Sequence, residues 1–466
     1  MLKQQLADRF HMEASLAMRA ALEQWMLNGN ATFHPLTFPQ RELWEASPIP
    51  VTDPANHISC LIEIKGDVVP EACEMALRRV AERQEALRIA FIQGKKRPVQ
   101  MVRKNSDVNF QYVTPSASQT TDEAVEEAAT RVAGKPFDLL RGALCRVEVI
   151  RRGPKDHVII LVLHHAIGDG WALGLLFREL CNSYFLPVAS SDAGLPDLPV
   201  TYTTWAKAER DFWHSGELER RGAFWKSFLS GNKRLWNSFE GPLTASGALP
   251  QRVCHFPHEL AEAISVLART NGATLFTTLL TAFQIALSRW TGDADVLVGT
   301  PVANRASRTV WKTMGYFAGI VPFRGQVEGD RTFSDSLRIV HQTAADCLAN
   351  AMPFVELASA LGDFSAPGHN PVFETRFALQ NHPIPRTGFL GWSATLKKRC
   401  SSGTARFHLG CEITTLKQGL EVVWLYRAAL FPATEIDRLA DLFKAVVVAA
   451  CRSPESRVKN LGVKYS

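Results

Sequence analysis

The sequence contains no apolar stretch long enough to cross a membrane. A membrane-spanning helix needs roughly 18–20 consecutive apolar residues, and no segment of the 466 residues is uninterrupted over that length. The first residues, MLKQQLADRFHMEASLAM, carry acidic side chains and no apolar core of the kind found in a secretory signal. We therefore expect a cytoplasmic protein without a membrane partner.

Concentrated positive charge is also absent. The formal net charge is only +6, and no run of Lys and Arg interleaved with aromatic residues stands out. Such runs are typical of nucleic-acid binding, so we expect no nucleic-acid partner. A mildly basic surface would instead suit an acidic protein partner.

Paired cysteines are missing as well. The nine cysteines lie far apart, and no two of them form a C-x-x-C pair. This pattern argues against a disulfide framework and indicates reduced thiols in the core of a cytoplasmic protein.

The length of the chain predicts two lobes, each with its own core. Residues 187–199 are rich in Pro, Ser, Asp and Gly, which is typical of a linker. We predict a helical extension over residues 1–33, an N-terminal lobe over 34–199 and a C-terminal lobe over 200–466. Strands alternate with helices in both halves, which predicts an α/β or α+β fold. We expect a monomer.

The most informative local feature is a buried strand that ends in two histidines. Residues 158–163 (VIILVL) form an unbroken apolar run, as expected of a strand covered on both faces. His164 and His165 follow, and adjacent side chains on a strand point to opposite faces, so only one of them can face a given cleft. Gly168, Asp169 and Gly170 then form a turn, and a helix begins at Trp171.

An imidazole at such a strand end could act as a general base. Three other interpretations compete on chemistry alone. A histidine in a buried strand is often structural. A metal site would need a third ligand beside His165 and Asp169, and the sequence offers no clear one. A Ser-His-Asp hydrolase would need a G-x-S-x-G elbow, which is absent.

A set of ordered motifs resembles the condensation domains of nonribosomal peptide synthesis. Residues 163–171 (LHHAIGDGW) are similar to the H-H-x-x-x-D-G signature of that family. Further similar segments follow the family's order: residues 37–44 (TFPQRELW), 83–91 (RQEALRIAF), 202–206 (YTTWA), 299–305 (GTPVANR), 314–324 (MGYFAGIVPFR) and 370–373 (NPVF). The resemblance covers residues 34 to about 460.

This resemblance implies a fold and a reaction. The family has two lobes similar to chloramphenicol acetyltransferase subunits, set in a V as a pseudo-dimer with a central tunnel. An acyl thioester on the phosphopantetheine arm of an acyl or peptidyl carrier protein enters one side, and a small-molecule or carrier-bound acceptor enters the other. By the family pattern His165 is catalytic, whereas His164, Asp169 and Gly170 are structural and Asp169 pairs with Arg305. The resemblance implies no metal and no cofactor on this chain.

Some positions depart from the family's motifs. Gln84 stands where the family has His, Gly319 where it has Asn, Ile320 where it has Thr, and His408 where it has Asp. No carrier or adenylation module is attached in this sequence, so we expect a stand-alone enzyme. The altered positions near the tunnel favour an unusual acceptor, with formation of an amide or ester and release of the chain. The alternatives are an epimerization-type domain and a non-catalytic domain that recruits carriers.

Overall fold

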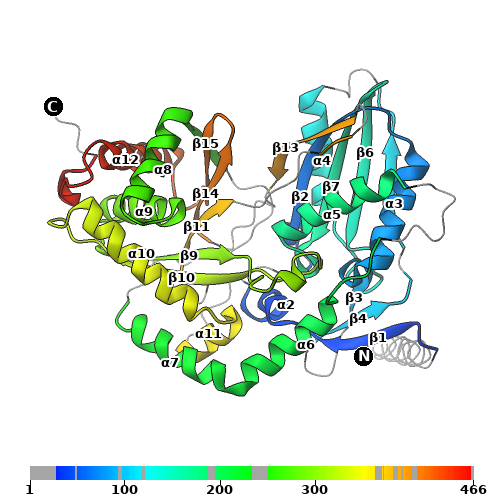
Figure 1. Ribbon diagram of the computed structural model, residues 1–466, viewed down its shortest axis with the longest axis horizontal. Coiled ribbons are helices and arrows are strands. Elements are labelled where there is room, and N and C mark those ends of the chain that lie inside the picture. Colours follow the sequence, from blue (N-terminus) through cyan, green and yellow to red (C-terminus); the bar gives the residue numbers. More distant parts are fainter. Residues whose placement is uncertain are drawn as a thin grey trace, which may run out of the picture.

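The computed structural model describes most of the chain in two lobes. The described residues are 28–47, 50–92, 97–105, 107–116, 121–186, 195–232, 250–362, 370, 372–380, 387–389, 392–400 and 407–462. The lobes diverge at the top of Figure 1 and are joined at the bottom, which is the V-shaped arrangement that the family resemblance implied. Within the described residues, no helix has both the length and the apolarity needed to span a bilayer.

The N-terminal lobe is built on a six-stranded sheet in the order β12-β13-β2-β7-β6-β5. Its strands are β2 (His57–Lys65), β5 (Asn109–Val113), β6 (Cys145–Gly153), β7 (Asp156–His164), β12 (Thr387–Phe389) and β13 (Trp392–Cys400). A smaller sheet in the order β1-β4-β3 consists of β1 (Ala31–Pro35), β3 (Ile89–Ile92) and β4 (Val99–Arg103). The helices of this lobe are α2 (Phe38–Arg41), α3 (Pro70–Arg83), α4 (Asp122–Gly134) and α5 (Gly170–Tyr184).

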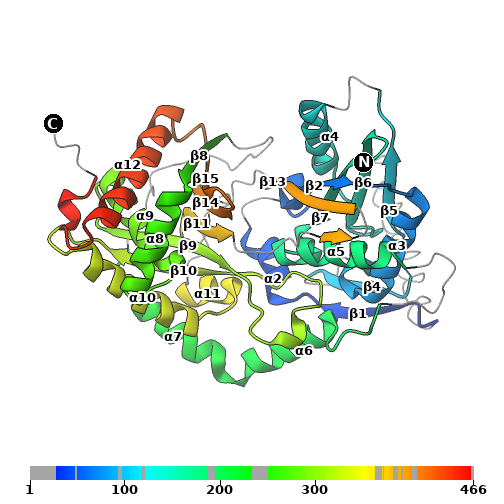
Figure 2. The ribbon, with the colours of Figure 1, turned by 45° about the horizontal axis from the view of Figure 1, so that its top comes forward.

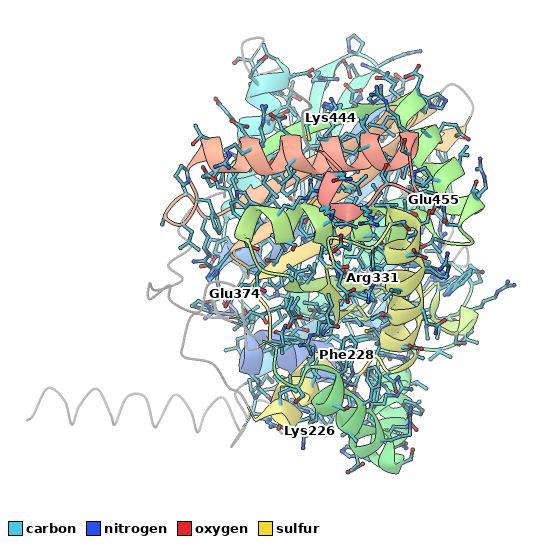
Figure 3. The ribbon with its side chains drawn as sticks, turned by 90° about the vertical axis from the view of Figure 1, so that its left-hand side faces the viewer. Lys226, Phe228, Arg331, Glu374, Lys444 and Glu455 are labelled. Carbon is cyan, nitrogen blue, oxygen red and sulfur yellow. The ribbon has the colours of Figure 1, made fainter. Side chains whose placement is uncertain are left out.

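The C-terminal lobe has its own six-stranded sheet, in the order β10-β9-β11-β14-β15-β8. Its strands are β8 (Gln251–Pro257), β9 (Asp295–Val302), β10 (Gly319–Gln326), β11 (Thr375–Gln380), β14 (Leu409–Leu416) and β15 (Gly419–Tyr426). Its helices are α8 (His258–Thr270), α9 (Leu275–Thr291), α10 (Phe333–Ala349), α11 (Phe354–Leu361) and α12 (Ala433–Arg452). Figure 3 shows the outer face of this lobe, where Lys444 on α12 and Arg331 before α10 are labelled.

Two helices connect the lobes along the bottom of Figure 1: α6 (Tyr202–Phe212) and α7 (Leu218–Phe228). The predicted lobe boundaries need two corrections. Residues 31–33 belong to β1 and not to a helix, while residues 1–27 of the predicted extension lie outside the described residues. Strands β12 and β13 come from the C-terminal half but join the N-terminal lobe's sheet, as Figure 2 shows.

The crossing of β13 has a physical reason. Strand β13 pairs antiparallel with β2, along the edge of β2 that β7 leaves uncovered. An uncovered edge would expose a row of unpaired N–H and C=O groups. A segment of the second lobe therefore completes the sheet of the first.

Each lobe has a separate hydrophobic core, and one loop of the C-terminal lobe crosses between them. Val310, Met314, Tyr316 and Phe317 lie in the core of the N-terminal lobe. We call residues 303–318, between β9 and β10, the crossing loop. Eight of the nine cysteines are described with their side chains; these eight are free, and five of them are buried.

A tight glycine contact in the crossing loop gives a test of this packing. Gly315 has a φ of 157°, and a Cβ at that position would lie 2.3 Å from the ring of Tyr202. We expect Gly315→Ala to lower the free energy of unfolding by about 2–4 kcal/mol, because it adds backbone strain and overpacks the ring.

The matched control is Gly319→Ala. Its Cβ would meet nothing closer than Val302 Cγ2 at 3.9 Å. Denaturant unfolding followed by tryptophan fluorescence should show little change for this variant. Equal stabilities for the two variants would contradict the packing of the crossing loop.

Candidate active site

The two histidines at the end of β7 have different surroundings. Strand β7 pairs with β2 on one side and β6 on the other, and His164 is fully buried between them. His164 Nε2 lies 2.9 Å from the carbonyl oxygen of Val51, and its Nδ1 accepts a hydrogen bond from Ala166 N–H at 3.1 Å. A carbonyl can only accept and a backbone N–H can only donate. Both contacts therefore select the neutral tautomer with the proton on Nε2.

His165 lies where the two lobes meet. It begins a single 3₁₀ turn (His165–Ile167) and is more exposed than His164. Its ring lies 4.4 Å from the ring of Tyr316, at an interplanar angle of 57°. Tyr316 belongs to the crossing loop, so the C-terminal lobe provides one wall of the surroundings of His165.

Gln40 holds the backbone that follows His165. Its amide Nε2 donates to the carbonyl of Ala166 at 3.0 Å and to Gln100 Oε1 at 3.1 Å. Gln40 also forms a capping box with Thr37 at the start of α2. The T-x-x-Q spacing indicates such a cap from the sequence alone. The contact of Gln40 with Ala166 could not be predicted from the sequence, because the two residues are far apart in the chain.

Asp169 connects the two lobes through backbone hydrogen bonds. It is the N-cap of α5, where its Oδ1 accepts from Ala172 N–H at 2.9 Å. Its Oδ2 accepts from the N–H groups of Phe317 and Ala318 in the crossing loop, both at 3.1 Å. The carboxylate is buried, and these three donors stabilise its charge. Asp169 therefore has a structural role: its carboxylate oxygens bind the backbone of α5 and of the crossing loop rather than His165.

Arg305 lies next to Asp169, as the resemblance implied. Its Nη2 is 3.8 Å from Asp169 Oδ1, a separation that allows an ion pair but no hydrogen bond. Its Nη1 donates to the carbonyls of Val310 and Thr313, and its guanidinium lies 3.8 Å from the centre of the Phe317 ring. Burial lowers the pKa of Arg305, and the nearby Asp169 opposes that shift.

The glycines on either side of Asp169 were predicted to be needed for a turn that only glycine can adopt, and the structure gives a different reason for them. Neither Gly168 nor Gly170 has a positive φ. At Gly168 a Cβ would lie 3.0 Å from Leu163 and 3.1 Å from Ala172. Gly168 therefore provides space between β7 and α5 and not left-handed backbone. Gly170 is the first residue of α5.

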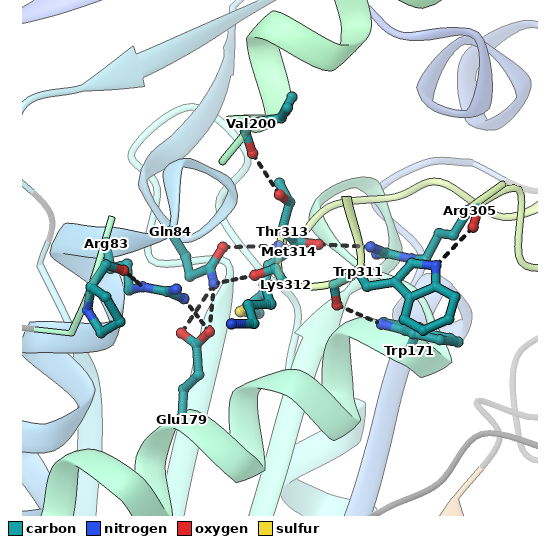
Figure 4. A network of polar contacts seen from close by, with 11 residues as sticks. Arg83, Gln84, Trp171, Glu179, Val200, Arg305, Trp311, Lys312, Thr313 and Met314 are labelled. Atoms are coloured by element: carbon teal, nitrogen blue, oxygen red, sulfur yellow. Dashed lines mark hydrogen bonds and ion pairs between the residues drawn. The ribbon is translucent and has the colours of Figure 1, made fainter. Parts of the chain in front are cut away.

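A second polar network joins the lobes beside the first, and Figure 4 shows it. The Gln84 amide is fully buried; its Nε2 donates to Glu179 on α5 and to the carbonyl of Lys312, and its Oε1 accepts from Met314 N–H at 2.8 Å. Arg83 forms an ion pair with Glu179. Gln84 therefore has a partner for its donor and its acceptor.

Tyr202 extends the connection to the second histidine. Its hydroxyl donates to the carbonyl of Tyr316 at 3.0 Å and lies 3.1 Å from the Thr37 hydroxyl. The Tyr316 ring in turn packs on His165. The site thus depends on α2, α6 and the crossing loop together, which no single sequence motif reveals.

Among the described residues, no group of three or more His, Cys, Asp or Glu side chains could hold a metal ion.

The carboxyl group of Glu209, near the crossing loop, has an unusual pKa. Asn304 Nδ2 lies 3.4 Å from Glu209 Oε1 on α6. Burial raises the pKa of Glu209 to about 7, and the contact with Asn304 opposes that rise.

Removal of Asp169 or Arg305 should destabilise the fold. Asp169→Ala leaves the Arg305 guanidinium buried without its counter-charge, and Arg305→Ala leaves the Asp169 carboxylate without its cation and removes one donor from the carbonyls of Val310 and Thr313. We expect each to cost about 3–5 kcal/mol of unfolding free energy. The double variant should cost less than the sum, by at least about 1 kcal/mol. Strict additivity in denaturant unfolding would contradict the pairing.

The raised pKa of Glu209 predicts a pH dependence. The folded protein binds this proton more tightly than the unfolded chain, whose value is near 4.5. The resulting stability is full below about pH 4.5 and is lost as the pH rises through about 7. Glu209→Gln should therefore match the natural chain at pH 4 and exceed its stability at pH 8 by about 1–3 kcal/mol. The same difference at both pH values would show that the carboxyl is not buried in this way.

Comparisons with known proteins agree with this architecture. One of the proteins that make up the linear gramicidin synthase of Brevibacillus parabrevis is 28% identical over 436 residues, which cover 92% of this chain and 8% of that protein. Phosphinothricin tripeptide synthetase PhsC of Streptomyces viridochromogenes is 29% identical over 435 residues, which cover 90% of this chain and 39% of that protein. The chain therefore spans well under half the length of these relatives.

Solved structures show the same two-lobed fold, which is similar to that of chloramphenicol acetyltransferase. The condensation domain of the Monacolin K polyketide synthase MokA has a TM-score of 0.78 at 18% identity, covering 92% of this chain and 99% of that one. The X-domain from teicoplanin biosynthesis has a TM-score of 0.81 at 20% identity, covering 92% and 97%. A sequence model of the family described as Condensation domain matches residues 30–464. This chain therefore belongs to the condensation domain family of nonribosomal peptide synthesis.

Proposed function

We propose that the chain transfers an acyl group from a carrier-bound thioester to an amine or hydroxyl acceptor, with His165 at the reaction centre. One observation carries this proposal: within the histidine loop, the protein itself engages His164 and Asp169 fully. Both nitrogens of His164 contact the backbone, and Asp169 accepts three backbone hydrogen bonds. His165 is the titratable side chain of this loop that remains partly exposed between the lobes.

The proposed reaction needs one group that can orient the acceptor and take its proton. The acceptor nitrogen or oxygen attacks the thioester carbonyl carbon, a C–N or C–O bond forms, and the C–S bond breaks. The acceptor's proton passes to His165 and then to the departing thiolate, which leaves as the thiol of the phosphopantetheine arm. An imidazole has an ordinary pKa near neutrality and can both accept and return a proton.

The other residues of the site would act by position. His164 fixes the turn through Ala166 N–H, and Gln40 holds the Ala166 carbonyl. Asp169 ties the start of α5 to the crossing loop, where Tyr316 contacts His165. Arg305 would support this arrangement as the cation next to Asp169, and Gly170 as the first residue of α5. A small movement between the lobes would therefore change the surroundings of His165.

The acceptor side would differ from the usual family pattern. Gly319 begins β10, directly after the two backbone N–H groups that bind Asp169. The atom nearest to where its Cβ would lie is Val302 Cγ2, at 3.9 Å. A glycine there leaves more room than the family's Asn. This room supports a bulkier or carrier-free acceptor and a product that is an amide or an ester.

The partner would be an acyl or peptidyl carrier protein, which supplies the phosphopantetheine arm and the acyl chain. We propose that the reaction uses no metal and no cofactor of this chain's own. An epimerization-type reaction, or carrier recruitment without turnover, is the competing role. Measuring product formation and carrier binding side by side separates these roles.

His165→Ala should keep the fold and lower turnover by roughly 10²–10⁴, the usual contribution of one acid–base group. The control is His258→Ala, an exposed histidine at the start of α8. Product is measured by intact mass spectrometry of a loaded carrier with candidate acceptors, and carrier binding is measured in parallel.

We expect His165→Ala to bind the carrier fully and to lose turnover, and His258→Ala to keep both. Unchanged turnover would contradict the role of His165. Carrier binding without turnover by the natural chain, across acceptors, would favour recruitment. Exchange of the α-proton on the bound acyl group, with no new bond, would indicate epimerization.

A further inference from the structure

A pocket of about 290 Å³ lies below the site, between the small sheet of the N-terminal lobe and helix α6. Figures 1 and 2 both place β1 and α6 side by side along the lower edge of the molecule. Leu36, Phe38 and Ala206 are buried and, with Val99, form an apolar part of the lining, which we call the floor. Such a floor can cover the apolar part of a ligand.

Three arginines, Arg41, Arg97 and Arg210, also line the pocket and are more exposed than the buried residues of its floor, so we call them the rim. His214 lines the pocket as well, and no lining residue is acidic. An apolar floor beneath several cations is a suitable surface for a molecule that has one apolar and one anionic end.

The arginines of the rim differ in their counter-charges. Arg41 pairs with Glu45 and Glu356, and Arg97 shares Glu45 with it, so two acids match these two cations. Arg210 interacts electrostatically with Glu209, a carboxyl whose pKa burial raises to about 7. The excess of positive charge at the rim therefore comes from Arg210.

The size and chemistry of the pocket restrict the ligand. Small-molecule sites usually occupy roughly 300–1,000 Å³, so this pocket is at the lower limit and suits a compact molecule. Arginine forks bind carboxylates and phosphates through two parallel hydrogen bonds. We propose that the pocket binds a small amphipathic anion, a short-chain carboxylate or phosphate ester whose apolar stem lies on Leu36, Phe38 and Ala206.

The pocket is connected to the candidate active site by direct contacts. Thr37 lines the pocket, and its hydroxyl lies 3.1 Å from the Tyr202 hydroxyl. Tyr202 donates to the Tyr316 carbonyl, and the Tyr316 ring packs on His165. A ligand in the pocket would therefore restrain the wall of the site from behind, without touching His165.

The test measures binding without any carrier, so its outcome is independent of the proposed reaction. Isothermal titration at constant ionic strength would use sodium hexanoate, hexyl phosphate, inorganic phosphate and hexanol. We expect saturable binding at one site for hexanoate or hexyl phosphate, and at least about tenfold weaker binding for phosphate and hexanol, which each lack one of the two features. The tighter of the two amphipathic anions identifies the natural headgroup as carboxylate or phosphate.

Variants locate the site. Arg210→Gln should weaken binding at least about tenfold, and Arg210→Lys should have an intermediate effect because it keeps the charge and loses the fork. The control is Lys226→Gln on α7, which lies at the lower edge of Figure 3 and should bind as the natural chain does. His214→Gln provides a second lining variant if Arg210→Gln does not fold.

Three results would overturn the proposal. The first is the absence of saturable binding by either amphipathic anion. The second is equal affinity for hexanol, which would show that charge is not recognised. The third is unchanged binding in folded Arg210→Gln and His214→Gln, which would place the anion elsewhere.

Discussion

The arrangement of the site depends on one buried carboxylate. Asp169 caps helix α5 in the N-terminal lobe and accepts two backbone hydrogen bonds from the crossing loop of the C-terminal lobe. A buried carboxylate needs several donors to offset its desolvation, and here the donors come from both lobes. Because these donors are backbone N–H groups, they fix the path of the crossing loop and not only the position of one side chain. The position of Tyr316 against His165 follows from that path.

The second network makes the same connection with neutral and charged groups. Gln84 binds the crossing loop at Lys312 and Met314 and also contacts Glu179 on α5. The sequence marked Gln84 as a departure from the family's histidine, and the structure gives the amide a consistent role. One amide offers a donor and an acceptor at the same time, which matches a carbonyl and an N–H two residues apart. The lobes are thus joined by two adjacent sets of hydrogen bonds, one to the Asp169 carboxylate and one to the Gln84 amide. The contact between the lobes therefore depends less on either set alone.

Much of the site could be predicted because it is local. The apolar run before His164 indicated a buried strand, and the alternation of side chains implied that the two histidines would differ. The sequence also placed Asp169 in a turn directly before a helix, a position where an aspartate favours a cap. The contacts of Gln40 with Ala166 and of Tyr202 with Tyr316 could not be predicted, since each joins segments far apart in the chain. The crossing of β13 into the first lobe's sheet was missed for the same reason: an edge that needs a partner does not specify which segment will provide it.

The central claim is that the two adjacent histidines have separate roles, one structural and one chemical. Two-bond ¹H–¹⁵N spectra of the imidazoles, assigned with His164→Gln and His165→Gln, test it directly. The account predicts that His164 has the neutral Nε2–H tautomer with and without substrates, because Val51 and Ala166 select it. The His165 signals should shift when a loaded carrier and an acceptor are added. The opposite result, with His164 responding to substrates and His165 unchanged, would contradict the account.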